Sequence, residues 1–411
     1  MHLGPLISAQ DPPAQAHPTG VGLRSVEASV LRARLTPELP AYGITRVANI
    51  TGFDVVGLPV HIAAKPQGAT LSSGSGKGLT SDGSWVSAVM EACEQAVWER
   101  LVLDPAHRLD SMRASLRSMR RAGLTVAEPE DLVHARGYQW HDDLAIDWTP
   151  GWDLVAGAQV WIPECLVTPA VVGHPNLRPF VSGSNGLASG AHVLEALLSG
   201  LLEVIERDGL RLHTRAAPRT AFDAAPLLAE ADPVVAQAIA ASRLPLRVID
   251  CTTEVGIPTF AAYLYDEPGM SIGCFEGSGA ALTTERALLR AVTEAAQSRC
   301  IIIAGARDDI FEVERAAATR VPRPVPPEPI GATPERIDLQ TGTLEGDLEV
   351  LVNRLAETGF GRVIAIRHTR ADELVQVVRV VVPGLEGVAH HRAAPGRRAR
   401  ELRARSAGVA P

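Results

Sequence analysis

The chain has 411 residues, of which 46% are hydrophobic and 21% are charged, a balance typical of a soluble globular protein with one large or two ordinary domains. Its formal net charge of -8 argues against broad, nonspecific binding of nucleic acid, which needs clustered Lys and Arg. No apolar run approaches the roughly 18 residues of a membrane span, so no membrane association is expected. The five cysteines are widely separated and odd in number, which favours reduced thiols and a cytoplasmic location over disulfides or a zinc site.

The N-terminal region is predicted to be disordered over residues 1–22, which are rich in Pro, Gln and Gly. A helix is expected from Ser25 to about Leu35, and the stretch VVGLPVHIAA has the β-branched density of a buried strand. A loop of Gly and Ser follows and leads into a helix with an apolar stripe from Val86 to Leu101.

The Gly and Ser loop contains Gly76 and Lys77 but does not form a Walker A motif. Leu71 stands where that motif needs its first Gly, and Gly78 stands where it needs Ser or Thr. Backbone N–H groups of consecutive small residues beside one lysine can still hold an anion. A flexible turn without a ligand is the alternative.

Acidic residues are grouped on the helix after this loop. Glu91 and Glu94 are three positions apart and share one face, and Ser87 lies one turn earlier on that face. Hard divalent cations need several oxygen ligands, and magnesium is usually held by a few carboxylates together with substrate phosphates. Glu91 and Glu94 are therefore candidates for a magnesium site.

A second acidic helix lies within residues 182–208, again behind a stretch of small residues. Its Glu195, Glu203 and Glu206 fall within roughly 80° of one another in helical projection. Like charges grouped in this way repel, so a bound cation would explain them, and a solvated acidic face is the alternative. The repeated form of the two helices favours the cation.

Between and after these helices the chain alternates predicted helices and strands. A helix is expected near Arg108 to Ala122, a strand from Gln159 to Val167, and further helices and strands over 216–265. The alternation predicts an α/β protein, in the sense of α+β mixed sheets with packed helices, and no segment-scale repeat family is indicated.

A third charged helix is predicted from Thr283 to about Ile303. Arg290, Glu294 and Gln297 lie on one of its faces. A surface salt bridge is the ordinary explanation of such a pair, but a guanidinium beside acid and amide groups also suits nucleotide phosphates.

The remaining chain is divided by a proline-rich linker over 321–340. A smaller unit over 341–390 contains a predicted helix from Leu344 to about Thr358 and two strands. The tail, 391–411, is arginine-rich and is expected to be flexible. His390 and His391 would point to opposite faces of a strand, which disfavours a metal site there.

Taken together, these stretches resemble the YcaO family, ATP-dependent enzymes that activate backbone amides of peptides. The resemblance is carried by SGKGLTSDGSWVSAVMEACE, SNGLASGAHVLEALLSGLLEVIERD, ALLRAVTEAAQSRCIIIAGARDD and VVRVVVPGLE, which occur in the family's order. It implies a YcaO-like fold in which ATP and Mg2+ bind in a cleft without a Walker motif. The catalytic core would span 23–320, and 341–390 would be the C-terminal part of the same domain.

The resemblance also implies roles for individual residues. The implied metal ligands are Glu91, Glu94, Glu195, Glu203 and Glu206. The implied nucleotide contacts are Lys77, Ser87, Arg290, Glu294, Gln297 and Arg299. Among them, Arg290 and Glu294 match a pair that lines the nucleotide site and are the candidate catalytic residues.

Two departures bear on the reaction. Glu94 is followed by Gln95 where the family usually has Arg, and the chain ends SAGVAP where many azoline-forming relatives end in PxPxP. The N-terminal third is similar to the branch that installs thioamides beside a TfuA-like partner. We therefore expect thioamide formation in a precursor peptide or protein. The family resemblance also implies a homodimer. Azoline-forming cyclodehydration, macroamidine formation and a non-catalytic peptide-binding scaffold are the alternatives.

Overall fold

The computed structural model describes residues 1–20, 22–172, 177–181, 183–213, 221–266, 273–306, 331–387 and 393–406. The chain divides into two compact units, each assembled from segments distant in sequence. Unit 1 comprises Met1–Gln15, Glu94–Ala217 and Thr341–Pro411, and unit 2 comprises Ala16–Cys93 and Pro218–Gln340. Several predicted features lie partly or wholly outside the described residues: Arg307 to Asp309, the linker up to residue 330, His390 and His391, and the last five residues of the tail.

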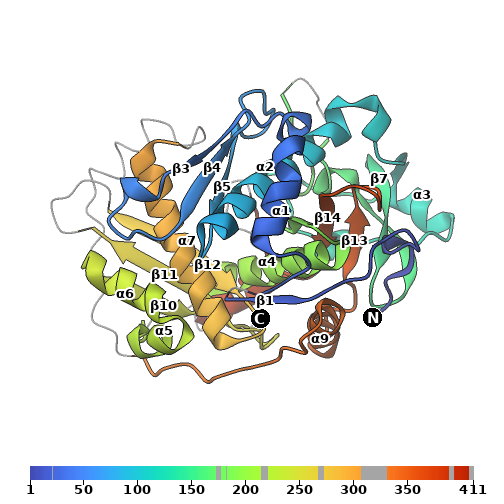
Figure 1. The fold of residues 1–411 in the computed structure, drawn as a ribbon. Coiled ribbons are helices and arrows are strands. Elements are labelled where there is room, and N and C mark those ends of the chain that lie inside the picture. Colours follow the sequence, from blue (N-terminus) through green and yellow to red (C-terminus); the bar gives the residue numbers. More distant parts are fainter. Residues whose placement is uncertain are drawn as a thin grey trace. The chain divides into compact units, whose positions relative to one another are not determined.

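Unit 2 contains two three-stranded antiparallel sheets, each followed in sequence by a long helix (Figure 1). The first sheet has the order β3, β4, β5, formed by Arg46–Asn49, Val60–Ala64 and Ser73–Lys77. Helix α2, Ser81–Leu103, follows it and belongs to this unit as far as Cys93. The second sheet has the order β10, β11, β12, formed by Leu246–Asp250, Thr259–Tyr265 and Cys274–Ala280. Helix α7, Thr284–Ala304, follows it.

These two sheet and helix segments are a structural repeat. A Cβ atom on Gly74 of β5 would lie 2.6 Å from the Ala88 carbonyl oxygen of α2, and one on Gly277 of β12 would lie 2.4 Å from the Ala291 carbonyl oxygen of α7. Gly277 follows Gly74 by the same number of residues as Ala291 follows Ala88. Glycine is needed because the strand backbone lies directly on the helix. This two-copy repeat was not predicted from the sequence, which indicated only that no segment-scale repeat family is present.

The other elements of unit 2 are a short hairpin and smaller helices. They are β1 (His17–Thr19), β2 (Gly22–Arg24), α1 (Ala28–Leu35), η2 (Thr36–Tyr42), η3 (Thr51–Phe53), α5 (Ala225–Ala231) and α6 (Pro233–Ser242). Between α5 and α6 the Asp232 side chain accepts hydrogen bonds from the N–H groups of Val234 and Val235, which ends one helix and caps the next. A core of buried apolar residues joins α5 and α6 to α7 and the second sheet.

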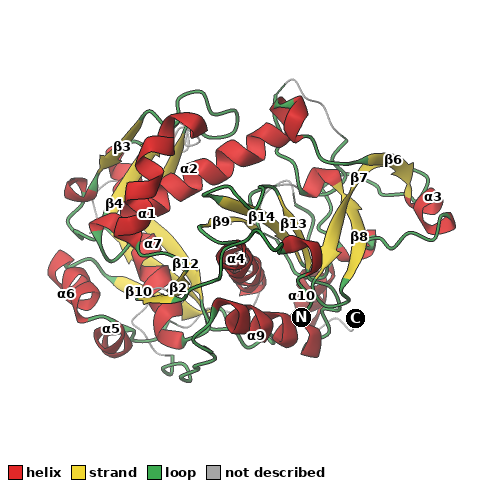
Figure 2. Ribbon diagram, turned by 45° about the vertical axis from the view of Figure 1, so that its right-hand side comes forward, coloured by secondary structure: helices red, strands yellow, loops and turns green. Residues whose placement is uncertain are grey.

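Unit 1 is built on an antiparallel sheet with the order β6, β7, β13, β14, β9, in which β8 also pairs with β7 (Figure 2). In that order the strands span Met112–Ser115, Ala145–Asp153, Ile364–Arg367, Gln376–Val381 and Leu187–Gly190, and β8 spans Ala158–Pro163. The helices are α3 (Leu116–Arg121), α4 (Val193–His213), α9 (Leu344–Glu357) and α10 (Arg397–Ser406), with 3-10 turns η1 (Gly4–Leu6), η4 (Pro105–His107), η5 (Pro129–Asp131) and η6 (Glu164–Leu166). Helix α4 packs on β9 and β14, and both α9 and α10 contact α4.

Strand β9 and helix α4 have the same strand-to-helix form as β5 and α2, with the small residues exchanged. Gly190 at the end of β9 lies against the first turn of α4, as Gly78 after β5 lies against the first turn of α2. In unit 1, however, the strand carries Ala188 and the helix carries Gly200, whose added Cβ would lie 3.4 Å from the Ala188 Cβ. Strand β9 and helix α4 thus also pack closely, but here the glycine that permits the contact belongs to the helix.

The predicted mixture of helices and sheets is confirmed, and every named strand pairing is antiparallel. The Gly and Ser stretch expected as a loop contains strand β5 instead. The helix expected near Arg108 to Ala122 is shorter, because residues 112–115 pair with β7 and Ser115 then caps α3 at the Ser118 N–H. The tail expected to be flexible contains α10, and residues 4–6 near the N-terminus form η1.

Candidate functional site

In unit 2 a hydrogen-bonded chain joins β5 to the helices α2 and α7. Both the backbone N–H and the hydroxyl of Ser75 donate to Glu91 Oε2, at 2.8 Å and 3.3 Å. The Gln297 amide donates in turn to the Ser75 hydroxyl at 3.1 Å. The predicted residues Glu91 and Gln297 are therefore brought together by a serine that the sequence analysis did not name.

The second strand and helix hold Glu294 in a related way. The Ser278 hydroxyl of β12 donates to Glu294 Oε1 at 3.3 Å, and the Lys77 ammonium forms an ion pair with Glu294 Oε2. Ser278 and Glu294 are the repeat counterparts of Ser75 and Glu91. Lys77, predicted as a phosphate contact, thus connects the first copy of the repeat to the carboxylate of the second.

Arg290 and Ser87 lie one helical turn before the two glutamates of the repeat. Both side chains are half-buried. The Arg290 guanidinium forms no ion pair or hydrogen bond with the part of the chain that the structure describes, which leaves it available to an anion such as a phosphate group. Ser87 occupies the corresponding position on α2.

Arg299, predicted as a nucleotide contact, lies in a buried ionic cluster. Its Nε donates to Asp54 at 2.8 Å, and its guanidinium also pairs with Asp266, just after β11. The guanidinium lies 5.1 Å from the centre of the Phe275 ring. These contacts tie α7 to η3 and to β11, so Arg299 has a clear structural role in this unit.

In unit 1 the acidic residues of α4 differ in exposure. Glu195 and Glu206 are buried, whereas Glu203 is half-buried and lies 3.7 Å from the Nε of Arg207, one turn further along. Glu94, also half-buried, lies in the part of α2 that belongs to this unit. Four of the five predicted metal ligands therefore lie in unit 1, and Glu91 lies in unit 2.

Arg379 on β14 was not among the predicted site residues, although it is 1% exposed and among the largest fully buried side chains. Its guanidinium donates to the carbonyl oxygens of Asn185 and Gly183 at 2.7 Å and 2.8 Å. Burial lowers the pKa of Arg379 to about 10, while the charges of Glu203 and Glu94 act in the opposite direction. It is a cation beside two of the predicted ligands.

The donor chemistry of these residues suits the predicted cofactors. Carboxylate oxygens are hard ligands of the kind that Mg2+ prefers, and Lys77 and Arg290 are cations suited to phosphate. Within the described residues, no group of three or more His, Cys, Asp or Glu side chains is arranged so that it could hold a metal ion. The five-carboxylate metal site stays a prediction.

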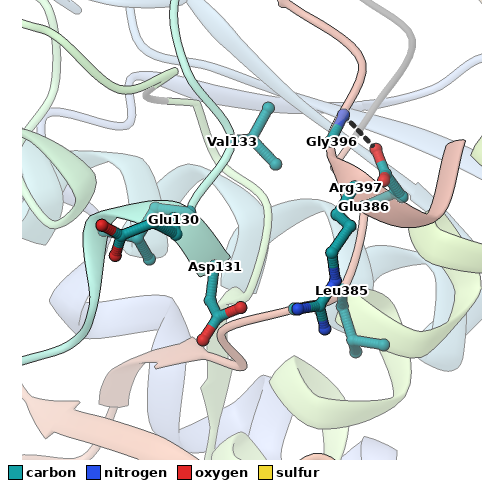
Figure 3. A pocket seen from close by; sticks show the side chains of 9 residues that line it. Glu130, Asp131, Val133, Leu385, Glu386, Gly396 and Arg397 are labelled. Carbon is teal, nitrogen blue, oxygen red and sulfur yellow. Dashed lines mark hydrogen bonds between the residues drawn. The ribbon is translucent and has the colours of Figure 1, made fainter. Parts of the chain in front are cut away.

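A separate pocket in unit 1 is lined by residues that the sequence analysis did not predict (Figure 3). Glu130 and Asp131 stand on one side, and Arg397 of α10 on the other. The Glu386 carboxylate in its wall accepts a hydrogen bond from the Gly396 N–H at 2.9 Å. The wall thus fixes the start of α10 and includes none of the predicted site residues.

Among known proteins, a family model described as "YcaO cyclodehydratase, ATP-ad Mg2+-binding" matches residues 75–386 of this chain. An uncharacterized protein in the tfuA 3' region of Rhizobium leguminosarum bv. trifolii is 32% identical over 395 residues, 88% of each chain. An uncharacterized protein of Methanothermobacter thermautotrophicus is 33% identical in an alignment of 373 positions that covers 85% of this chain and 91% of that protein.

Two solved structures have a similar fold. The YcaO protein of Methanopyrus kandleri bound with AMPPCP and Mg2+ matches with a TM-score of 0.65 and 26% identity, over 89% of this chain and 92% of that one. A heterocyclase in complex with substrate and cofactor matches with a TM-score of 0.72 and 24% identity over 92% of this chain. The present chain spans about half of the heterocyclase, 54% of its length, and at this identity the likeness concerns the fold alone.

Within the described ranges, every helix is too short or too polar to cross a bilayer. The predicted fold is confirmed by the structural matches, and the predicted cofactors, ATP and Mg2+, agree with the description of the matching family. By the extent of the family match and the identity to its relatives, the chain belongs to the YcaO family.

Proposed function

We propose that this protein uses ATP to activate a backbone amide of a ribosomally made peptide or protein, and that its product is a thioamide. The activation is supported by the repeated glutamates on strand-backed helices, with Lys77 and Arg290 as cations for the phosphates. The thioamide is supported by the similarity to a protein in the tfuA 3' region. A TfuA-like partner would then work beside it.

In this proposal the carboxylates Glu91, Glu94, Glu195, Glu203 and Glu206 hold magnesium, which when bound offsets the negative charge of the phosphates. Arg290 and Lys77 orient the phosphates, and Ser87, Gln297 and Arg299 complete the nucleotide site. Glu294 holds the Lys77 ammonium in place. The protein's contribution is mainly positioning and charge, as in other phosphoryl transfers.

The proposed reaction replaces one oxygen atom. Sulfide adds to the carbonyl carbon, and the carbonyl oxygen takes the γ-phosphoryl group of ATP, so that ADP leaves. The C–O bond then breaks, phosphate departs with the oxygen, and loss of the sulfur-bound proton leaves a C=S bond. Phosphorylation is needed because an amide oxygen is otherwise a poor leaving group.

Cyclodehydration to an azoline is a second candidate, favoured by the word "cyclodehydratase" in the description of the matching family. There a side chain of the substrate replaces sulfide as nucleophile. The mass of the product distinguishes the reactions, since exchange of oxygen for sulfur raises the mass and cyclodehydration removes one water. Macroamidine formation also removes one water, and fragmentation of the product separates it from an azoline.

The test is ADP release measured with candidate precursor peptides and sulfide, with and without an added TfuA-like protein. We expect ADP release coupled to peptide modification, and a loss of at least about 100-fold in Glu203→Gln and in Glu206→Gln. Glu357→Gln, at the exposed end of α9, is the matched control. Modification that proceeds normally without nucleotide would contradict the proposal, and a pure scaffold would show no magnesium-dependent binding of an ATP analogue.

Two further features belong to the proposal. All five cysteines lie in the described residues, where none forms a disulfide, and four are buried, which suits a reducing cytoplasm. We also propose a homodimer, which sedimentation of the purified protein would test.

A further inference from the structure

Arg379 lies on β14 beside the position of β9 that corresponds to Ser75 in unit 2. It pairs in register with Leu187 of the neighbouring strand β9, and residues opposite each other on an antiparallel pair lie on the same face of the sheet. Leu187 precedes Ala188 as Ser75 precedes Gly76 in unit 2. The strand position that supplies a hydroxyl to Glu91 in unit 2 is therefore apolar in unit 1, and the adjacent strand supplies a guanidinium.

Contacts with an aromatic ring and with two backbone carbonyls fix the position of the Arg379 guanidinium. Its guanidinium lies 5.3 Å from the centre of the Trp98 ring on α2, and its two hydrogen bonds fix the loop at Gly183 and Asn185, which leads into β9 and α4. Both acceptors are uncharged backbone carbonyls, and the opposite charges that act on the guanidinium are those of Glu203 and Glu94. A buried cation in this setting is costly unless opposite charge is close by.

We propose that Arg379 is a positioning residue of the predicted magnesium site, which supplies the counter-charge of Glu94 and Glu203 while no metal is bound and fixes the loop before α4. The inference depends on the proposed function, because it takes these two glutamates to be metal ligands. Its consequence concerns the order of binding. A fixed positive charge repels a free divalent cation, so magnesium binds well only together with the negative phosphates of the nucleotide.

The experiment measures Mn2+ binding by electron paramagnetic resonance, with and without a nonhydrolysable ATP analogue. In Arg379→Met, Mn2+ without nucleotide should bind at least about tenfold more tightly than in the wild type, because the repelling charge is gone. The ratio between the Mn2+ affinities measured with and without the ATP analogue should therefore be smaller in this variant than in the wild type. Arg379→Lys keeps the charge and should stay within about threefold of the wild type.

Arg178→Met is the matched control. Arg178 is a half-buried guanidinium of unit 1 that donates to the backbone carbonyls of Cys165, Thr168 and Pro169. The charges that act on it are those of Cys165 and Glu164, neither of which is a predicted ligand. Its replacement should lower the melting temperature but leave Mn2+ affinity unchanged. If Arg379→Met does not fold, Arg379→Gln removes the charge while keeping a donor for the loop.

The outcomes separate the two proposals. Unchanged or weaker Mn2+ binding in the neutral variants, or an equal rise in Arg379→Lys, overturns the role of Arg379 while the wild-type metal site stands. If instead Glu203→Gln binds Mn2+ and the analogue as the wild type does, the metal site itself is wrong, and the role of Arg379 is overturned with it.

Discussion

The carboxylates of the two units are stabilised in different ways by similar pieces of backbone. In unit 2, Glu91 and Glu294 each accept a hydrogen bond from a serine that lies between two glycines of an edge strand. In unit 1, Glu203 lies on a helix backed by a similar strand, but its positive neighbours are Arg207 on its own helix and Arg379 on another strand. Where the strand carries Leu187 at the position of Ser75, a charged residue of the adjacent strand takes over the serine's role.

The largest effect should come from the glycines that let the strands of unit 2 lie on their helices. In Gly76→Ala the new Cβ would lie 2.0 Å from the Ala88 nitrogen, so strand and helix must separate, and we expect a loss of about 3 kcal/mol or more of unfolding free energy. Gly200→Ala, with its nearest contact at 3.0 Å, should lose less. Denaturant unfolding measures both, and equal losses would show that the two packings do not differ.

Gly83→Ala is the control for this series. Gly83 lies in the first turn of α2, and its added Cβ would meet only the Thr80 hydroxyl at 3.1 Å and Gly78 at 3.9 Å. A helical Gly replaced by Ala gains up to about 1 kcal/mol. We expect no loss of stability in this variant.

The second effect is a dependence on pH that arises in unit 1. Burial lowers the pKa of His368 to about 3, with a smaller contribution from the charge of Arg379, and neither ring nitrogen has a hydrogen-bond partner among the described residues. The unfolded chain takes up this proton near pH 6.5, whereas the folded chain does so only near pH 3. Stability should therefore fall as the pH is lowered between these values, by up to about 1.4 kcal/mol per pH unit.

The measurement compares melting temperatures of the wild type and His368→Leu from pH 7 to pH 4. The variant cannot take up this proton, so its melting temperature should decline less steeply. Parallel declines would remove His368 from the explanation.

A smaller effect is expected at the link between the two copies of the repeat. Lys77→Met removes the ion pair of Glu294 but keeps the hydrogen bond from Ser278, and it removes a cation proposed for the phosphates. We expect a loss of about 1 kcal/mol of stability, because the pair is only partly buried, and a clear rise in KM for ATP. A double variant with Glu294→Gln should recover stability but not KM. If it recovers KM as well, Lys77 does not contact the nucleotide.

The smallest effect should come from the two serines. Ser75→Ala and Ser278→Ala each remove one hydroxyl hydrogen bond to a glutamate, worth about 1 kcal/mol. Ser75→Ala should cost slightly more, because its hydroxyl also accepts from Gln297. Thermal unfolding of the two variants measures the difference, and a much larger loss for one of them would show that the copies are not equivalent.

Some of this organisation followed from the sequence by itself. The apolar periodicity of α4, α7 and α9 predicted helices close to the observed bounds, and the spacing of Glu195, Glu203 and Glu206 placed them on one face. Such patterns are local, because each depends on residues within a few turns of one another. The motifs that resembled the YcaO family were local in the same sense.

Tertiary structure decided the rest. Gly and Ser have low strand propensity, so β5 forms only because β4 pairs with it and α2 packs on its glycines. Similarly, no pattern near Arg379 indicates that it acts on Glu203. The register of β14 against β9 puts the guanidinium there, and that register depends on contacts between segments far apart in the chain.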